Sequence, residues 1–491
     1  MEKSNKHNPN ILIVYVDQHR YDCLGAYGNK DIRTPNIDAL ASDGVTYRNC
    51  FCPFPICTPS RYSFLSGLYV HQHTGWDNHC TLPQGIDTFP KILKEAGYNT
   101  KAVGKMHFTP TYLDVGFQEM ELAEQDGIGR YDDDYHEYLK SKGLIDRTDL
   151  LDQVKEYRAT APQEYWNTYG AVASNLDEED YSTTWIGNRA VESLEKWGEE
   201  GNLLMVGFIK PHHPFDAPEP WKSMYNDAEL SVLPGWTEKP NAEDIEIHNG
   251  YFPHSELTEA KLKKVMACYY ASISQIDYHV GRMIEKLKEK GLYNDTLIIY
   301  TSDHGDYMGF HHLLLKNNYM YDPVVKVPLI IKYPQGVREG EVTDALVNSL
   351  DVTTTIIKQA GCEAGRFMQG TDLSQDCMGK TVIYAERLNS IEYMVRTRTR
   401  KLLLCKQHDK SKFFDLEKDP LEYNNLFNDS LYKNEIEEHI RLLYQWILFE
   451  ATSYPHLDES APVISSDGRC TALCHDRKTS MEYFYNKMKF E

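Results

Sequence analysis

The segment Cys57-Thr58-Pro59-Ser60-Arg61 places a thiol, a proline and an arginine at a spacing that is rare by chance. Pro59 is typical of a first helical turn, so we expect a helix that begins at Pro59, with Cys57 just before it. A helix N-terminus presents free N–H groups and partial positive charge, and both favour an anion. A free cysteine is also often a small buried hydrophobe. The other polar segments decide whether Cys57 belongs to an anion site.

Carboxylates follow two apolar segments of the chain. Asp17 ends the run 10–16, and Asp303-His304 comes shortly after the run 296–300. Such runs are typical of strands that are buried on both faces of a parallel sheet. A single aspartate at a strand end often only caps the next helix. Two at comparable strand ends predict a site for Ca²⁺ or Mg²⁺, because hard cations take oxygen ligands.

Lysines and histidines follow further segments of the same kind. Gly104-Lys105-Met106-His107 comes after the expected strand 98–104, and Lys210-Pro211-His212-His213 comes after the expected strand 203–209. Without other evidence, the simplest interpretation of Lys105 and His107 is a solvated lysine and a hydrogen-bonded histidine in a loop, with no functional role. In open α/β sheets, however, ligands bind beyond the carboxyl ends of strands. These positions therefore predict one pocket shared with the strand-end aspartates.

Buried strands and amphipathic helices alternate along most of the chain. The longest helix, over 258–290, has apolar residues at helical spacing and stops at Gly291. The alternation predicts an α/β fold, with a doubly wound, mostly parallel sheet flanked by helices. After about residue 375 the pattern changes to a strand over 395–404 with an exposed basic face and a helix over 434–450. We therefore expect a main domain, 1–374, and a smaller α+β domain, 375–491.

Composition narrows the class of partner. Lys and Arg number 52 against 73 Asp and Glu, and the net charge of −21 argues against nucleic acid, since phosphate contacts dominate such binding. A small anionic substrate stays compatible, because local cations and a metal reverse the field in one pocket. No apolar run approaches the roughly 18 residues of a membrane helix, and no signal-peptide core precedes the first strand. We expect no membrane partner and a cytoplasmic location.

Cysteine usage agrees with that compartment. Eleven cysteines without framework spacing favour a reducing environment over a disulfide scaffold. Cys470, Cys474 and His475 near the C-terminus suggest a zinc knuckle. Three ligands without a fourth are more typical of a tail, or of an arm used in a homo-oligomer.

The segment 57–61 resembles the signature of type I, formylglycine-dependent sulfatases, which belong to the alkaline-phosphatase-like superfamily. Gly104-Lys105-Met106-His107, His212-His213-Pro214 and the run from Asp303-His304-Gly305 to Lys316 resemble further segments of that family and occur in its order. The segment 414–422 resembles the signature of the family's C-terminal domain, which contains an antiparallel sheet. The resemblance thus covers nearly the whole chain.

The resemblance implies a modified residue and a metal ion. Cys57 would be oxidised to Cα-formylglycine by a formylglycine-generating or sulfatase-maturating enzyme, and one hydroxyl of the hydrated aldehyde would attack sulfur. The second hydroxyl would then expel sulfate as the carbonyl re-forms. The chain departs from the family at Gln18, where many members carry a second acid. The implied ligands of one divalent ion, Ca²⁺ first and Mg²⁺ or Mn²⁺ as alternatives, are Asp17, Gln18, position 57, Asp303 and His304.

The resemblance also implies roles for the side chains around Cys57. Cations hold the anion and orient position 57, and histidines move protons. The implied residues are Arg61 for position 57, Lys105 and Lys316 for sulfate, His107 as base on a formylglycine hydroxyl, and His212 as general acid, with the adjacent His213 as the alternative.

The function predicted in this way is hydrolysis of a sulfuric ester, with a small anionic sulfate ester as substrate. A sulfated carbohydrate of the glycosaminoglycan type is favoured, and a choline-sulfatase-like activity is the alternative. Phosphonate monoesters or phosphodiesters are a second alternative, against which Ser60 argues because phosphonate-cleaving relatives tend to carry another residue there. A non-catalytic binding protein with unmodified Cys57 is the remotest, since buried unpaired charge is costly.

Overall fold

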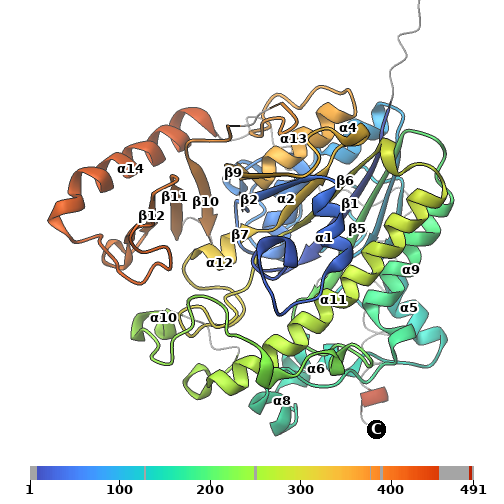
Figure 1. Cartoon of the computed structure of the whole chain (residues 1–491), viewed down its shortest axis with the longest axis horizontal. Helices are drawn as coiled ribbons and strands as arrows, with labels where there is room; N and C mark the ends of the chain where they lie inside the picture. Colours follow the sequence, from blue (N-terminus) through green and yellow to red (C-terminus); the bar gives the residue numbers. More distant parts are fainter. Residues whose placement is uncertain are drawn as a thin grey trace, which may run out of the picture.

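The computed structural model describes residues 8–125, 129–247, 252–375, 378–387, 391–452 and 486–488. Within these residues the strands form two separate sheets, a mixed sheet of nine strands and an antiparallel sheet of four. The larger sheet lies at the centre of the molecule between helices, and the smaller one lies beside it with α14 (Figure 1). The predicted α/β fold with a smaller antiparallel sheet is confirmed.

Five neighbouring parallel strands make up one half of the large sheet. They are predominantly apolar because helices cover both faces. Their order is β4 (Glu119–Leu122), β3 (Asn99–Gly104), β5 (Asn202–Pro211), β1 (Asn10–Asp17) and β6 (Thr296–Ser302). Because these strands run in the same direction, Asp17, Lys105, His212 and Asp303 lie at or just beyond the same edge.

The other half of the large sheet is mixed. β8 (Leu329–Lys332) pairs antiparallel with β6, and β2 (Val45–Phe51) pairs antiparallel with β8 and β7 (Lys326–Val327) and parallel with β9 (Glu341–Asn348). The apolar segment 326–332 therefore forms two short strands, one on either side of Pro328.

Alternate residues of β1 enter two different cores. Ile11, Ile13 and Tyr15 pack with α2 (Cys57–Ser66), α4 (Phe89–Glu95) and α13 (Ser349–Gln359). Leu12, Val14 and Val16 pack on the other face with α1 (Pro35–Ser42), α9 (Ser182–Glu195) and α11 (Glu259–Glu289). Helices on both faces confirm the doubly wound arrangement (Figure 1).

Shorter helices occupy the connections between these elements. Four of them lie between β4 and β5: α5 (Asp134–Ser141), α6 (Arg147–Gln153), α7 (Lys155–Arg158) and α8 (Gln163–Asn167). The others are α3 (Val70–His73) before β3, α10 (Ala242–Ile247) before β6 and α12 (Asp322–Val325) before β7.

The second sheet is a meander of β10 (Ile383–Arg387), β11 (Glu392–Arg396), β12 (Arg400–Cys405) and β13 (Lys412–Asp415). Helix α14 (Lys433–Gln445) packs on it and continues into a π-helical turn, Trp446–Glu450. The helix agrees with the predicted one over 434–450. The division of the chain at residue 374 stays a prediction.

The predicted continuous strand over 395–404 is wrong. The segment is a hairpin, and its turn is closed by a hydrogen bond from the Thr397 amide to the Arg400 carbonyl, 2.9 Å. Arg398 is exposed, but acids from other segments pair with the remaining basic side chains, Arg396, Arg400 and Lys401. Lys401 is fully buried and pairs with Asp322 at 2.8 Å and Glu422 at 2.7 Å. These partners are distant in sequence, so local pattern cannot reveal them.

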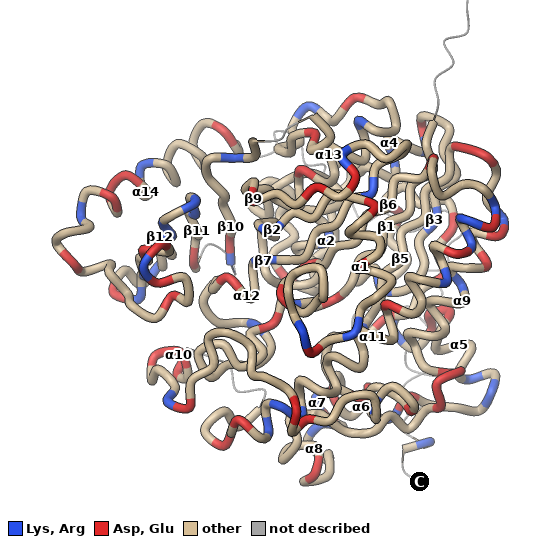
Figure 2. The backbone as a smooth tube through the Cα atoms, in the orientation of Figure 1, with Lys and Arg blue, Asp and Glu red and all other residues tan. Residues whose placement is uncertain are grey.

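Charge is distributed over the whole molecule. Figure 2 shows acidic and basic segments interspersed along the chain rather than gathered on one element. Across the described ranges, no helix combines the length and the apolar character that crossing a membrane requires. Cys470, Cys474 and His475, the residues of the suggested zinc knuckle, lie outside the described residues.

Gly104, which precedes Lys105, generates a prediction about how the sheet positions the site. It has a φ of +87°, and an added Cβ would lie 2.1 Å from the Gly207 carbonyl oxygen on β5. We expect Gly104→Ala to lower the free energy of unfolding by about 2–4 kcal/mol, because β3 must then move away from β5. Urea unfolding of the full chain measures this.

Gly97 provides the matched control for Gly104. It has a φ of +94° but no atom within 4 Å of an added Cβ, so Gly97→Ala should lower stability by only about 1 kcal/mol through backbone strain. Equal losses in the two variants would contradict the close approach of β3 and β5.

Candidate active site

Helix α2 presents Cys57 at its first turn. Ile56 before it is extended, with φ −140° and ψ 144°, and the helix begins at Cys57, two residues earlier than Pro59 alone indicates. The helix can start there because a proline is tolerated throughout the first turn, where amide hydrogens have no helical partner. Asn78 caps one of these amides, as its Oδ1 accepts from the Thr58 amide at 3.1 Å. Cys57 is buried.

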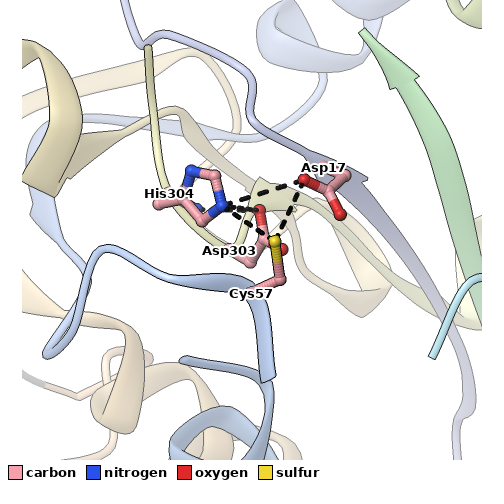
Figure 3. Close-up of side chains that lie close together, drawn as sticks. All are labelled: Asp17, Cys57, Asp303 and His304. Atoms are coloured by element: carbon pink, nitrogen blue, oxygen red, sulfur yellow. Dashed lines mark hydrogen bonds and ion pairs between the residues drawn. The ribbon is translucent and has the colours of Figure 1, made fainter. Parts of the chain in front are cut away.

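Four buried side chains meet at the carboxyl edge of the large sheet. Asp17 ends β1, Asp303 and His304 follow β6, and Cys57 begins α2; one ligand atom from each lies within 4.8 Å of the others. Cys57 Sγ lies 3.7 Å from Asp17 Oδ1 and 3.3 Å from His304 Nε2. Figure 3 shows the four side chains pointing toward one another. The donor set of two carboxylates, one imidazole and one group at position 57 fits a divalent ion.

The orientation of the His304 ring supports this role. Its Nδ1 lies 2.9 Å from the Gly305 carbonyl, so Nδ1 carries the hydrogen and donates it. Nε2 then holds the lone pair that faces the cluster, which is the tautomer of a metal-binding histidine. Burial lowers the pKa of His304, and Lys316 lowers it further.

Arg61 compensates the buried carboxylates. Its Nε donates to Asp303 Oδ2 at 3.0 Å, and a terminal nitrogen donates to Asp17 Oδ2 at 3.2 Å. The other terminal nitrogen donates to the Lys105 carbonyl at 2.7 Å. Arg61 thus ties three strand ends to α2, and it leaves Asp17 Oδ1 facing the cluster. In this structure Arg61 contacts the metal-ligand candidates Asp17 and Asp303 and forms no hydrogen bond with the Cys57 side chain.

Two lysines line the pocket beside the cluster. Lys105 Nζ lies 2.6 Å from Asp17 Oδ2, and Lys316 Nζ lies 3.0 Å from Cys57 Sγ and 3.1 Å from His304 Nε2. Burial alone would raise the pKa of the Asp17 carboxyl, but Lys105, His212 and Arg61 together lower it well below its usual range. Asp17 therefore stays ionised inside the protein.

The thiol of Cys57 is protonated at neutral pH. Burial raises its pKa to about 11, and the Asp17 carboxylate also raises it, against the opposing effect of Lys316. A protonated thiol is a weak nucleophile.

The histidines differ in their hydrogen bonds. His212 Nδ1 donates to the His213 carbonyl at 2.8 Å, whereas His213 Nδ1 lies 2.6 Å from Asp152 Oδ2. His107 is buried, and neither of its ring nitrogens has a hydrogen-bond partner in the described part of the chain. Burial lowers the pKa of both His107 and His212 well below the usual range, and in His212 the neighbouring His213 adds to this.

Gln18 lies beside the cluster in a fixed orientation. Its Nε2 donates to Asp306 Oδ2 at 2.7 Å, so Oε1 is directed to Lys316 Nζ, 3.1 Å away. The backbone at Gln18 has a φ of 62°, and its amide donates to Asp303 Oδ1 at 3.0 Å. The amide oxygen thus lies on the pocket side of the side chain, and its part in metal binding stays a prediction.

The structure brings all the sequence-predicted site residues to one edge of the sheet. It also brings in residues that the sequence did not indicate. Gln125 contacts Lys105, Glu124 contacts the backbone of His107, and Asp306 holds Gln18. Of these, only Asp306 lies within a recognisable segment, directly after Asp303-His304-Gly305.

The site combines three buried cations with two buried carboxylates, and histidines lie beside them. Such a pocket suits a small anion that is bound together with a divalent ion, because the excess of positive charge then opposes the charge of the ligand. At the carboxyl edge of a doubly wound sheet, it defines a hydrolase of anionic esters.

Comparison with known protein families gives the particular family. The family model for sulfatases matches residues 9–362, and the model for the C-terminal region of N-sulphoglucosamine sulphohydrolase matches residues 309–446. The chain belongs to the sulfatase family and is a sulfatase enzyme.

Individual relatives agree with this. An arylsulfatase of Clostridium perfringens is 29% identical, over 87% of this chain and 92% of the relative. An N-acetylglucosamine-6-O-sulfatase of Bacteroides thetaiotaomicron is 26% identical, over 90% of this chain and 87% of the relative. Among solved structures, the phosphonate monoester hydrolase of Agrobacterium radiobacter matches with a TM-score of 0.74 at 22% identity, over 89% of this chain and 95% of that one. At that identity the match shows the fold alone.

The cluster predicts a specific dependence of ion binding on Asp303. We expect Asp303→Asn to weaken binding of Mn²⁺ or Ca²⁺ by about 100-fold, because it removes a ligand charge. Calorimetric titration of protein stripped with a chelator measures this affinity. The matched control is Asp277→Asn, a buried carboxylate that accepts from the Ile37 amide at 2.7 Å; its affinity should stay within about threefold of wild type. Equal losses in both variants would contradict the assignment.

Proposed function

We propose that this sulfatase releases sulfate from a sulfated carbohydrate, and that Cys57 acts after oxidation to Cα-formylglycine. The observation that carries the proposal is the position of Cys57. It begins a helix, faces three candidate metal ligands and lies 3.0 Å from the ammonium of Lys316. A reactive group at position 57 would therefore have the divalent ion on one side and the Lys316 ammonium beside it. Both would stabilise an attacking oxygen and the sulfuryl group that it attacks.

Oxidation of position 57 supports turnover better than the thiol does. The thiol is protonated and buried, so it is a poor nucleophile. Formylglycine, made by a maturation enzyme that supplies the oxidant, provides a hydrated aldehyde whose hydroxyl attacks sulfur. A bound divalent ion lowers the pKa of that hydroxyl. Asp17, Asp303 and His304 would hold the ion, with the amide oxygen of Gln18 as a further neutral ligand.

The cations of this chain bind and orient the sulfuryl group. Lys105 directly follows β3 and contacts Asp17, whereas Lys316 lies in the loop after β6 and contacts Cys57; both are buried. Because water is excluded, their charge acts strongly on the sulfuryl oxygens. Arg61 holds Asp17 and Asp303 in place for the ion.

Two histidines would move protons during the reaction. His212 donates from Nδ1 to a carbonyl, so Nε2 is the atom that would hand a proton to the leaving oxygen of the ester. It can do so only as the imidazolium, which the negative charge of a bound sulfate ester would favour. His213 is paired with Asp152, so His212 is favoured as the general acid. His107 would accept a proton from position 57 when sulfate leaves.

The ligand set bears on the identity of the ion. Carboxylate ligands favour Ca²⁺, the ion predicted first from the sequence, but Ca²⁺ takes oxygen ligands almost exclusively. His304 contributes a nitrogen whose lone pair faces the cluster. We therefore place Mn²⁺ ahead of Ca²⁺ and Mg²⁺, since a mixed set of imidazole and carboxylate suits a transition metal.

Two observations support a sulfated carbohydrate as the substrate: one relative of this chain, and the side chains near His213. The N-acetylglucosamine-6-O-sulfatase is similar over 90% of this chain. The segment 110–200 contributes buried acids and aromatics near His213, such as Asp152 and Tyr165, which suit the hydroxyl groups of a sugar. The same acids would suit a quaternary ammonium such as choline, and the phosphonate alternative has the fold in common with this chain.

The activity itself gives the direct test. Protein produced together with a maturation enzyme should release sulfate from a sulfated sugar at least tenfold faster than from choline sulfate, a phosphonate monoester or a phosphate diester, because the pocket is matched to sulfate and to a polyol. Cys57→Ala should lose all sulfate release. Undiminished release by Cys57→Ala would contradict the role of position 57, and a preference for a phosphonate would contradict the choice of ester.

His212 gives a prediction that depends on the leaving group. We expect His212→Ala to slow release from a sugar sulfate by about 10³-fold and from 4-nitrophenyl sulfate by about tenfold or less, because nitrophenolate leaves without a proton. His213→Ala is the matched control and should slow both esters by the same factor. If His213→Ala instead shows the dependence on leaving group, the assignment of the two histidines is reversed.

A further inference from the structure

Gln125 lies three residues after the end of β4 and contacts two segments of the catalytic edge, the edge of the large sheet that carries Asp17, Lys105, His212 and Asp303. Its Oε1 accepts a hydrogen bond from Lys105 Nζ at 3.1 Å. Its Nε2 donates to Asp149 Oδ1 at 2.6 Å and to the His213 carbonyl at 3.2 Å. The side chain is buried, with 1% of its surface exposed. One amide group therefore touches the lysine of the sulfate pocket and the segment that carries the general acid.

The orientation of this amide is determined by its partners. Asp149 and the His213 carbonyl can only accept hydrogen bonds, so the NH₂ group of Gln125 must face them. The oxygen is then left to face Lys105, which can only donate. Asp149 in turn is paired with Arg130, so its carboxylate is held from the other side. Gln125 is thus a fixed acceptor for the ammonium and not an adaptable contact.

A fixed acceptor matters because a lysine is a flexible chain that ends in a point charge. The Lys105 ammonium carries three hydrogens, of which one is directed to Asp17 Oδ2 at 2.6 Å and one to Gln125 Oε1. The third is then directed to a remaining position in the pocket, where a sulfuryl oxygen can accept it. Without Gln125 the ammonium would be free to turn around Asp17.

Glu124, the preceding residue, acts in the same way on His107. One of its carboxylate oxygens accepts from the Met106 and His107 amides, both at 2.9 Å. His107 has a φ of 56°, which is unfavourable for a residue with a side chain and persists only when its surroundings hold it. Thr58 Oγ1 holds the other side of the same residue by donating to the His107 carbonyl at 2.7 Å.

We propose that Glu124 and Gln125 are a positioning pair for the catalytic edge: Gln125 aims the ammonium of Lys105 at the sulfuryl group, and Glu124 fixes the backbone that carries the base His107. The inference rests on the proposed function of Lys105 and His107. It adds that the two residues act on different steps, Gln125 on anion binding and Glu124 on turnover.

The test separates these two effects in metal-loaded holoenzyme. We expect Gln125→Met to weaken binding of inorganic sulfate, measured by calorimetry, by about tenfold and to raise KM by a similar factor, the loss that follows one hydrogen bond to a charged group. We expect Glu124→Met to lower kcat by about 30-fold with KM and sulfate affinity within about threefold of wild type. Glu124→Gln keeps an oxygen acceptor for both amides and should restore kcat to within about threefold.

The matched control for Gln125 is Gln153, which also donates to the His213 carbonyl, at 3.1 Å, but forms no hydrogen bond with Lys105. Gln153→Met should leave sulfate affinity within about twofold of wild type. Thermal unfolding of every variant identifies a general loss of folding, which would lower the melting temperature without changing the sulfate affinity of the folded protein.

Three results would overturn the inference: unchanged sulfate affinity in Gln125→Met, an equal loss in Gln153→Met, or failure of Glu124→Gln to restore kcat. Failure of the proposed function is a different result, because wild-type holoenzyme would then release no sulfate from any ester. The calorimetric comparison of Gln125→Met with Gln153→Met does not require turnover, so it decides the role of Gln125 in either case.

Discussion

The burial of two carboxylates is the constraint on which the rest of the site depends. Asp17 and Asp303 have no exposed surface, and an ionised carboxylate in such a place is costly unless it is paired. Arg61 and Lys105 provide the pairing, at 2.6–3.2 Å. Arg61 reaches both carboxylates only when α2, β1 and β6 are assembled, and Lys105 reaches Asp17 only when β1 and β3 are. The same contacts therefore hold the sheet edge together and leave Asp17 Oδ1 and His304 Nε2 facing position 57.

That constraint explains why the chemistry is located where it is. Parallel strands bring residues that are far apart in sequence to one edge, and the first turn of α2 brings an anion-favouring helix start to the same place. Arg61, Lys105 and Lys316 gather around the two ligand carboxylates, even though the whole chain carries −21. The net charge of the chain therefore does not exclude a local group of cations in the pocket.

Sequence predicts the central residues well because strand ends can be recognised. Asp17, Lys105 and Asp303 each follow an apolar run, and the parallel arrangement then brings them together. The roles of Gln125 and Glu124 cannot be predicted from the sequence, because a single amide or carboxylate in a loop forms no recognisable pattern. The partners of these two side chains also lie 17–88 residues away along the chain. The hairpin turn at 397–399 is not predicted for a related reason: Thr-Arg-Thr contains none of the usual turn residues.

The central claim is that position 57 works as an aldehyde hydrate beside a metal ion. Mass spectrometry of the peptide that spans Cys57, from protein produced with a maturation enzyme and active on a sulfate ester, tests it most directly. The account predicts that active protein carries the mass of formylglycine or its hydrate at position 57, in proportion to its activity. Full activity in protein whose Cys57 is an unmodified thiol throughout would contradict it.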